Sequence, residues 1–303
     1  MPRSSLFPEH LPSIVEEATA MTLLMGAVAY DPKVVTIWGG FRSWLRARGL
    51  PFDFVLYSHY ERQVEDLVAG RLHAAWNSPL AWLRAERLAK AAGRGIRPLV
   101  MRDTDRDLHS VILVRGDSTF EKVSDLKDQT VGLGAVDSPQ ATLVPRSFLR
   151  EAGLTPGENV TVKRFDVGVG LHGDHIGGER DAARALLAGE VAAAAIIDVN
   201  HLQFSREGTL PSGRTRVLAQ TPAYDHCNMT VVDTAPQDLV GRFGELLLSM
   251  SYADPEVRPL LDLEGLTMWQ EGRSTGYSLL DAAVDEEGFY DADGRVTTGE
   301  YRP

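Results

Sequence analysis

The sequence predicts an α/β protein of two lobes with mostly parallel sheets. Apolar strands alternate with segments of helical periodicity along most of the chain, as in sheets covered by helices on both faces. A chain of 303 residues can form two units of roughly 100–150 residues, each with its own core. Polar residues follow several predicted strands, where open α/β sheets bind ligands. We therefore expect a ligand cleft between the lobes.

The first lobe is predicted from a regular series of strands and helices. The opening apolar strand closes at Asp31-Pro32, and the following helix has apolar residues at helical spacing and stops at Gly49. Two more strand–helix pairs and a fourth strand follow. The predicted strands are residues 21–28, 52–57, 72–76 and 96–101, and the predicted helices are residues 33–48, 60–69 and 77–92.

The second lobe is predicted to begin with a strand at residues 109–115, after the charged residues 103–107. The stretch 124–145 then reads as a helical turn, a strand, a polar bend and a helix. The glycine-rich residues 167–178 predict a mobile loop. In the rest of the chain, which belongs to both lobes, the predicted strands are residues 130–136, 160–165, 191–197, 216–219 and 228–232. The predicted helices are residues 180–188, 236–251, 255–261 and 278–284.

Two crossings between the lobes are expected, near residues 103–110 and 205–215. This assigns residues 21–105 and 215–303 to the first lobe and residues 106–214 to the second, after an N-terminal arm of residues 1–20. The tail from Asp285 is polar and is expected to be at most partly ordered.

Composition excludes several classes of function and site. A formal net charge of -11 argues against binding nucleic acid or an anionic membrane surface. The single cysteine, Cys227, excludes an intrachain disulfide and a cysteine-rich metal site. The N-terminus lacks a signal-peptide pattern. We expect a cytoplasmic protein if Met1 is the natural start, and a periplasmic or other extracytoplasmic one if a leader was trimmed.

The polar bend after residues 130–136 has two interpretations. A strand that opens into a helix start presents free backbone N–H groups, which favour an anionic or strongly polar ligand. The same pattern also describes a plain capped helix, with Ser138 as N-cap and Pro139 at the first helical position. Both interpretations stay open at this point.

Three runs resemble the phosphate/phosphonate solute-binding proteins of ABC importers. They begin YERQVEDLVAG at residue 60, SVILVRGDSTF at residue 110 and ERDAARALLAG at residue 179. The resemblance covers roughly residues 22–250. It implies the type II periplasmic-binding fold, in which two lobes close on a ligand, and an ABC permease as partner if the protein is exported.

The residues that hold the ligand in that family differ here at two places. The family has a run of small hydroxyl residues where this chain reads Ser138-Pro139-Gln140-Ala141, so only Ser138 and the later Thr142 keep a hydroxyl. The family also tends to place a histidine where this chain has Glu179. A carboxylate there would repel a phosphonate dianion.

The binding interpretation predicts a small, polar, anion-bearing ligand, with no required cofactor, no nucleic acid and no membrane insertion. The residues predicted to contact the ligand are Tyr30, His59, Asn77, Ser78, Ser138, Gln140, Ala141, Thr142, Glu179 and Asp198.

The alternative is a cytosolic enzyme on the same fold, similar to decarboxylases or other lyases. His59, His175 and Glu179 would act as acid and base groups, or His172, His175 and Glu179 would bind a divalent metal. Loop histidines often form such clusters without a metal, and Gly177-Gly178 argue against a continuous helix there. The adjacent His226 and Cys227 could offer a base and a nucleophile, but they would point to opposite faces if they lay on a strand.

Overall fold

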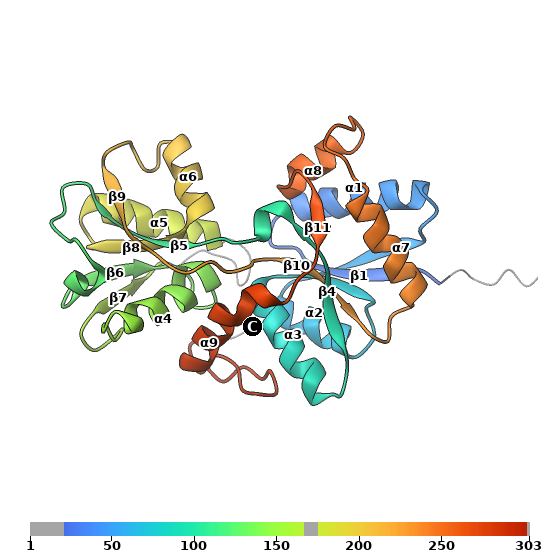
Figure 1. The fold of residues 1–303 in the computed structure, drawn as a ribbon, viewed down its shortest axis with the longest axis horizontal. Helices are drawn as coiled ribbons and strands as arrows, with labels where there is room; N and C mark the ends of the chain where they lie inside the picture. Colours follow the sequence, from blue (N-terminus) through green and yellow to red (C-terminus); the bar gives the residue numbers. More distant parts are fainter. Residues whose placement is uncertain (1–20, 167–174, 302–303) are drawn as a thin grey trace, which may run out of the picture.

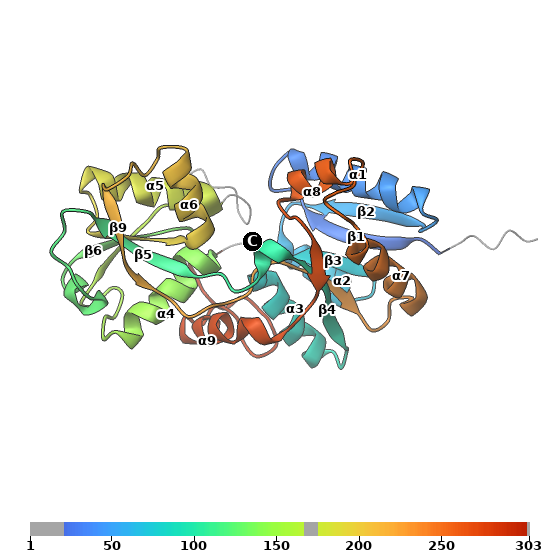
Figure 2. The ribbon, with the colours of Figure 1, turned by 45° about the horizontal axis from the view of Figure 1, so that its top comes forward.

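The computed structural model describes residues 21–166 and 175–301. These form two α/β lobes that lie side by side along the long axis of the molecule (Figures 1 and 2). The predicted two-lobed α/β fold class is therefore confirmed, but both sheets are mixed and not mostly parallel as predicted. The N-terminal arm of residues 1–20 and the candidate ligand His172 lie outside the described residues.

The first lobe contains a mixed sheet with the strand order β11-β4-β10-β3-β1-β2. Its strands are β1 (Leu23–Val28), β2 (Phe52–Tyr57), β3 (Ala74–Asn77), β4 (Ile96–Arg102), β10 (Asn228–Val232) and β11 (Trp269–Glu271). Strand β1 pairs in parallel with β2 and β3, as predicted. Strand β10 instead runs antiparallel between β3 and β4, and β11 is an antiparallel edge strand that the sequence did not predict.

The helices of the first lobe bury the apolar stripe that their periodicity predicts. They are α1 (Lys33–Ala47), α2 (Tyr60–Val68), α3 (Pro79–Ala91), α7 (Gln237–Leu248) and α8 (Arg258–Glu264). On α1 the buried residues are Val34, Ile37, Trp38, Phe41, Trp44 and Leu45. This spacing of three and four residues turns one helix face toward the sheet.

The second lobe contains a five-stranded sheet with the order β7-β6-β8-β5-β9. Its strands are β5 (Ser110–Arg115), β6 (Thr130–Leu133), β7 (Thr161–Arg164), β8 (Ala193–Ile197) and β9 (Thr215–Gln220). Its helical elements are η2 (Val123–Leu126), the π-helical turn η3 (Pro139–Leu143), α4 (Val144–Glu151), α5 (His175–Ala188) and α6 (Asp198–Arg206). Strand β6 is parallel to β7 and β8, whereas β5 is antiparallel to β8 and β9.

One of the two crossings between the lobes differs from the prediction. The first passes through the short helix η1 (Asp103–Asp105) between β4 and β5, as expected. Strand β9, however, pairs with β5 and so stays in the second sheet, which moves the return crossing from residues 205–215 to the link between β9 and β10. The predicted lobe boundary at residue 215 is therefore too early by the length of β9.

The start of α5 also differs from the prediction. The helix begins at His175 and continues through Gly177 and Gly178. A Cβ atom at Gly178 would overlap the carbonyl oxygen of Phe165. Glycine at this position therefore allows the helix to lie against the end of β7, which outweighs its low helix propensity.

The C-terminal segment is ordered and contacts both lobes, contrary to the prediction of a partly ordered tail. It comprises the short turn η4 (Thr275–Tyr277), α9 (Ser278–Glu286) and the residues up to Tyr301. Its Phe289, Tyr290 and Tyr301 are buried with Leu83 of α3 and Val144 of α4. Because aromatic side chains bury large apolar areas, this segment is anchored despite its polar composition.

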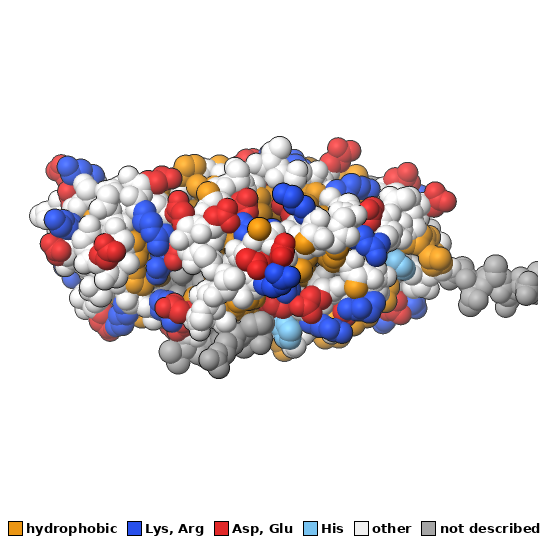
Figure 3. All heavy atoms as spheres, turned by 90° about the horizontal axis from the view of Figure 1, so that it is seen from below, with side chains coloured by type: hydrophobic (Ala, Val, Ile, Leu, Met, Phe, Trp, Pro, Cys, Tyr) orange, Lys and Arg blue, Asp and Glu red, His pale blue; other side chains and the backbone are white. Residues whose placement is uncertain are grey.

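Ion pairs add to these contacts. Arg87 of α3 bonds to Asp281 of α9 at 2.6 Å, and Arg146 of α4 lies 2.9 Å from Glu287. Acidic and basic side chains are interspersed over the described part of the face seen from below (Figure 3). The C-terminal segment is thus bound to one helix of each lobe.

Candidate ligand cleft

One small pocket is lined by residues of both lobes. Tyr60 and Glu61 come from the start of α2, Ser78 from the start of α3, Asp137 from the bend before η3, and Tyr290 from the C-terminal segment. Apolar contacts from α3 complete the lining. The pocket therefore lies where helix starts of the two lobes meet.

The protein's own carboxylates lie at these helix starts. Glu61 occupies the first turn of α2, and Asp137 precedes the capping residue of η3. Each side chain belongs to a residue that is only 5% exposed. Because helix N-termini carry a partial positive charge, both carboxylates complement the helix dipoles.

Glu61 is held by several neighbours. The hydroxyl of Tyr301 donates to Glu61 Oε1 at 2.8 Å, and His59 Nδ1 lies 3.6 Å from Oε2. The guanidinium of Arg84 donates to the Glu61 backbone carbonyl at 2.8 Å. Burial, followed by the charge of Glu61, raises the pKa of Tyr290 well above its usual range. The Tyr290 hydroxyl therefore stays protonated in this pocket.

The η3 turn uses its own backbone donors. Ser138 Oγ accepts from the Ala141 N–H at 3.1 Å, and the Ser138 carbonyl accepts from Thr142 and Leu143. Pro139 has no N–H group. Most of the donors predicted to face a ligand at residues 138–142 are therefore bonded within the turn, as in a plain capped helix.

Glu179 is a buried carboxylate that bonds to groups from three elements of the second lobe. It accepts from Gln140 Nε2 at 3.1 Å, from the Ile197 backbone N–H at 2.8 Å and from Asn200 Nδ2 at 3.0 Å. Its residue exposure is 0%. A carboxylate of the chain thus occupies the donors that an external anion would otherwise need.

Several other predicted site residues are used structurally. Asn77 is buried in the first lobe, where it donates to Thr230 Oγ1 at 2.8 Å and accepts from Gln63 Nε2 at 2.9 Å. Thr142 faces a separate hollow beside Arg146 and Arg164. Ala141 is fully buried.

The remaining predicted site residues lie near the surface, or their side chains are outside the described part of the structure. Tyr30 is 42% exposed, and Asp198 Oδ1 accepts from its neighbour Val199 N–H at 2.7 Å. The side chain of His175 is outside the described part. His59 lies beside Glu61 in the first lobe, whereas Glu179 is enclosed in the second. Two members of the acid–base grouping of the enzyme alternative, His59 and Glu179, thus lie in different lobes.

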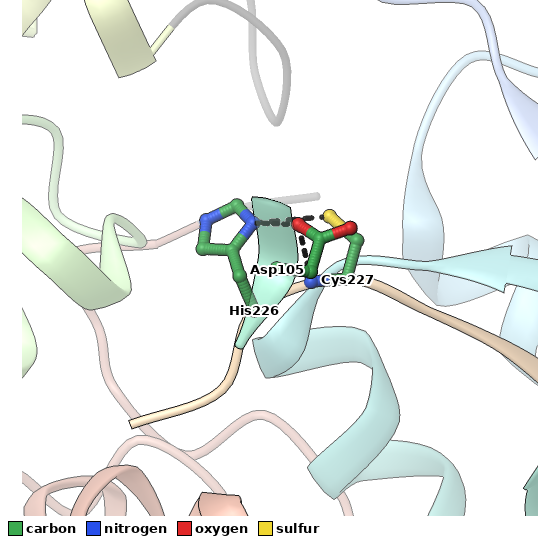
Figure 4. A group of neighbouring side chains, drawn as sticks. All are labelled: Asp105, His226 and Cys227. Carbon is green, nitrogen blue, oxygen red and sulfur yellow. Dashed lines mark hydrogen bonds and ion pairs between the residues drawn. The ribbon is translucent and has the colours of Figure 1, made fainter. Parts of the chain in front are cut away.

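The two crossings bring together a polar cluster that the sequence did not predict. Arg102 Nε and Nη2 donate to Asp105 at 2.5 and 2.9 Å, and His226 Nδ1 lies 3.4 Å from Asp105 Oδ1 and 3.2 Å from Cys227 Sγ (Figure 4). Residues 226–227 precede β10, so the alternation expected on a strand does not apply. Burial alone would raise the pKa of Asp105, but the Arg102 guanidinium lowers it to about 2. Burial and Asp105 raise the pKa of the Cys227 thiol.

Larger hollows lie away from the junction of the lobes. One is at the edge of the second sheet, around Arg115, Phe120 and Gly189, and another lies between α3 and α9. Neither joins the predicted ligand residues of the two lobes. We treat the interlobe pocket as the candidate site because residues of both lobes line it. Its volume of about 10 Å³ has room for about one water molecule, so a larger ligand could enter only if the lobes separated.

A family model described as the ABC transporter, phosphonate, periplasmic substrate-binding protein matches residues 26–277. The chain belongs to this family. It is therefore a ligand-binding protein with the family's two-lobed α/β fold, and the resemblance predicted from the sequence is confirmed. No helix among its described residues is long and apolar enough to cross a membrane.

Solved structures of similar fold are distant in sequence. PhnD1 from Prochlorococcus marinus, in complex with methylphosphonate, is 15% identical with a TM-score of 0.64, and the match covers 88% of this chain and 97% of that chain. XAC2383 from Xanthomonas citri, bound to chloride ion, is 19% identical with a TM-score of 0.65, covering 88% and 98%.

The aliphatic sulphonate binding protein SsuA from Escherichia coli is 18% identical with a TM-score of 0.52, covering 87% of this chain and 82% of that chain. No curated protein matches this solute-binding protein. At these identities, the structural neighbours support its fold and leave the ligand open.

Of the residues that line the pocket, only Ser78 is among the predicted ligand contacts, and Tyr60, Glu61, Asp137 and Tyr290 are not. Glu61 reads as an ordinary acidic residue in a first helical turn, and Tyr290 lies in the tail that was expected to be poorly ordered. An aromatic pair, Phe289-Tyr290, in an otherwise polar tail was the available signal, because such residues are usually buried against something.

Proposed function

We propose that this protein binds a small polar molecule between its lobes and delivers it to an ABC permease. The observation that carries the proposal is the pocket in which Glu61 and Ser78 of one lobe meet Asp137 of the other. Residues from both lobes can recognise one ligand and stabilise the closed arrangement. Delivery to a permease would require the protein to lie outside the cytoplasm. Cell fractionation would distinguish this location from the cytoplasmic one predicted from the N-terminus.

We further propose that the group recognised in the pocket is cationic. Two buried carboxylates and the rings of Tyr60 and Tyr290 line it, and both carboxylates and aromatic faces attract cations. The η3 donors are bonded internally, and Glu179 occupies its neighbouring donors. The anionic group predicted from the sequence would therefore lie away from this pocket.

A three-compound comparison tests the ligand class. Isothermal titration calorimetry would be run with methylphosphonate, a small alkylamine and an aminoalkylphosphonate that carries both groups. We expect the amine-bearing compounds to bind and methylphosphonate alone to bind at least tenfold more weakly. Equal binding of methylphosphonate and the aminoalkylphosphonate would contradict recognition of a cation, whereas no binding of any compound would leave the ligand class unsupported.

Variants of the two carboxylates locate the site. Glu61→Gln and Asp137→Asn should each weaken binding of the amine by about tenfold, since each removes a charge partly screened from water. Glu245→Gln is the control, because Glu245 lies on α7 of the same lobe with its side chain 72% exposed. An effect of the control equal to that of Glu61→Gln would place the ligand elsewhere.

A further inference from the structure

The two crossings between the lobes meet at three side chains of different chemistry. Asp105 ends η1 on the first crossing, and His226 and Cys227 end the return crossing. One oxygen, one nitrogen and one sulfur atom of these residues lie within 4.8 Å of one another. Asp105 is 1% exposed and Cys227 is 8% exposed, so the group is screened from solvent.

The backbone holds these residues in place. The His226 N–H donates to the Asp105 carbonyl at 2.8 Å, and the Tyr277 hydroxyl donates to the His226 carbonyl at 2.8 Å. The Cys227 N–H donates to Asp105 Oδ1 at 3.2 Å. The cluster is therefore set by contacts between segments far apart in sequence.

Two of the three spacings between the candidate ligand atoms match the edges of a tetrahedral zinc site. Bonds of about 2.0–2.3 Å to oxygen, nitrogen and sulfur put neighbouring ligand atoms roughly 3.3–3.6 Å apart. Here Cys227 Sγ lies 3.2 Å from His226 Nδ1, and the same nitrogen lies 3.4 Å from Asp105 Oδ1. Small side-chain shifts would bring all three atoms onto one ion.

The geometry does not suit a nucleophile–base–acid relay. In such a relay one imidazole nitrogen faces the nucleophile and the other faces the carboxylate. In this cluster His226 Nδ1 faces both Cys227 and Asp105 (Figure 4). Three ligand atoms within 4.8 Å of one another fit a shared ion better than a proton relay.

Neighbouring side chains would support a bound ion. Arg102 donates to both oxygens of Asp105 and fixes the carboxylate orientation, as outer groups do around metal-ligating carboxylates. Arg102 also donates to the Glu264 backbone carbonyl at 2.7 Å. The buried Glu264 side chain lies 3.4 Å from the guanidinium, and burial raises the pKa of its carboxyl to about 7.

We propose that Asp105, His226 and Cys227 bind a Zn²⁺ ion where the two crossings meet. Binding forms a zinc–thiolate bond as the Cys227 proton leaves to solvent. His226 has a side chain 21% exposed and marks the open side of the site. A fourth position there would be filled by water or by a group of the ligand.

Cobalt substitution tests the site directly. Full-length protein, purified without a metal-affinity tag and treated with chelator, would be titrated with Co²⁺ and followed by absorption. A thiolate–cobalt charge-transfer band that saturates at one equivalent is expected. Because Cys227 is the single cysteine of the sequence, such a band has one assignment within the chain. Added Zn²⁺ should remove the band by displacing cobalt.

Variants separate this site from adventitious binding. Cys227→Ser should lose the charge-transfer band while its circular dichroism stays native, and His226→Gln should weaken Co²⁺ binding by about tenfold or more. His201→Gln, on α6 of the second lobe, is the control and should bind as the wild type does. Absence of the band in wild-type protein, or its persistence in folded Cys227→Ser protein, would overturn the proposal.

Discussion

At the scale of single residues, Glu179 shows how one buried charge can organise its surroundings. It joins η3, the end of β8 and α6 through hydrogen bonds to Gln140, Ile197 and Asn200. Such a carboxylate is stable in the interior only while its partners remain. Its role in the second lobe is therefore testable through stability.

Removing the Glu179 carboxylate should leave its three hydrogen-bond donors without an acceptor. We expect Glu179→Ala to lower the free energy of unfolding by about 3–5 kcal/mol, because three buried donors lose their acceptor. Glu179→Gln should lose roughly 1–2 kcal/mol, since its amide oxygen still accepts. Urea denaturation measures both. Partial recovery of Glu179→Ala stability by formate, which wild-type protein should not show, would confirm that the donors form an anion site.

Glu86 predicts a pH-dependent contribution to stability. Burial and the nearby Asp281 raise the pKa of Glu86 to about 7, from a usual value of 4.5. Because the folded state holds this proton more tightly, stability is lost as pH rises from about 4.5 through 7. Glu86→Gln should therefore gain roughly 1–3 kcal/mol relative to wild type at pH 8 and nothing at pH 4. Thermal unfolding of both proteins at several pH values measures this difference. A stability difference that does not change with pH would show that the pKa of Glu86 is not raised.

At the scale of elements, the start of α5 depends on close backbone packing. The helix meets the end of β7 at Gly178, where no side chain fits beside the Phe165 carbonyl. The residues that position Glu179 therefore include a glycine with no polar role.

An alanine at position 178 should distinguish the effect of close packing on stability from the effect of helix propensity. Gly178→Ala is expected to destabilise the protein by roughly 1–3 kcal/mol, because the new methyl group must displace backbone. Gly39→Ala on α1 is the matched control, since an added Cβ there meets no atom within 4 Å and should stabilise by up to about 1 kcal/mol. Denaturant titration of both variants gives the comparison, and a stabilised Gly178→Ala protein would contradict the close approach.

At the scale of the whole molecule, the C-terminal segment links the lobes on one side of the pocket. Arg164 of β7 bonds to Glu300 at 2.7 Å, and the next residue, Tyr301, bonds to Glu61 of α2. An apolar cluster beneath these contacts contains side chains of both lobes. Relative motion of the lobes must therefore preserve or rearrange this segment.

Replacing Phe289 by alanine should measure how much the C-terminal segment contributes to stability. Phe289 is 1% exposed, and its ring centroid lies 5.0 Å from that of Tyr290 and 5.1 Å from that of Tyr301. Phe289→Ala should cost about 3–5 kcal/mol in urea unfolding. The exposed Val35→Ala should change stability by less than about 0.5 kcal/mol. Near-equal losses of stability in Phe289→Ala and Val35→Ala would show that the C-terminal segment contributes little to stability.

Local patterns in the sequence determined the elements and the family. Apolar spacing predicted α1 through Val34, Ile37 and Phe41, and the runs near residues 60, 110 and 179 carried the resemblance that the family match confirms. These features depend on neighbouring residues along one helix or strand, so a linear pattern records them.

Contacts between distant segments decided the rest. The pairing of β9 with β5, the burial of Tyr301 against Glu61, and the convergence of Asp105 with His226 each join residues about 100 or more positions apart. The sequence predicted Glu179 as a site residue, but only the tertiary structure showed that its charge is satisfied within the protein. Periodicity carries no record of such pairings, because they depend on how the packed elements meet.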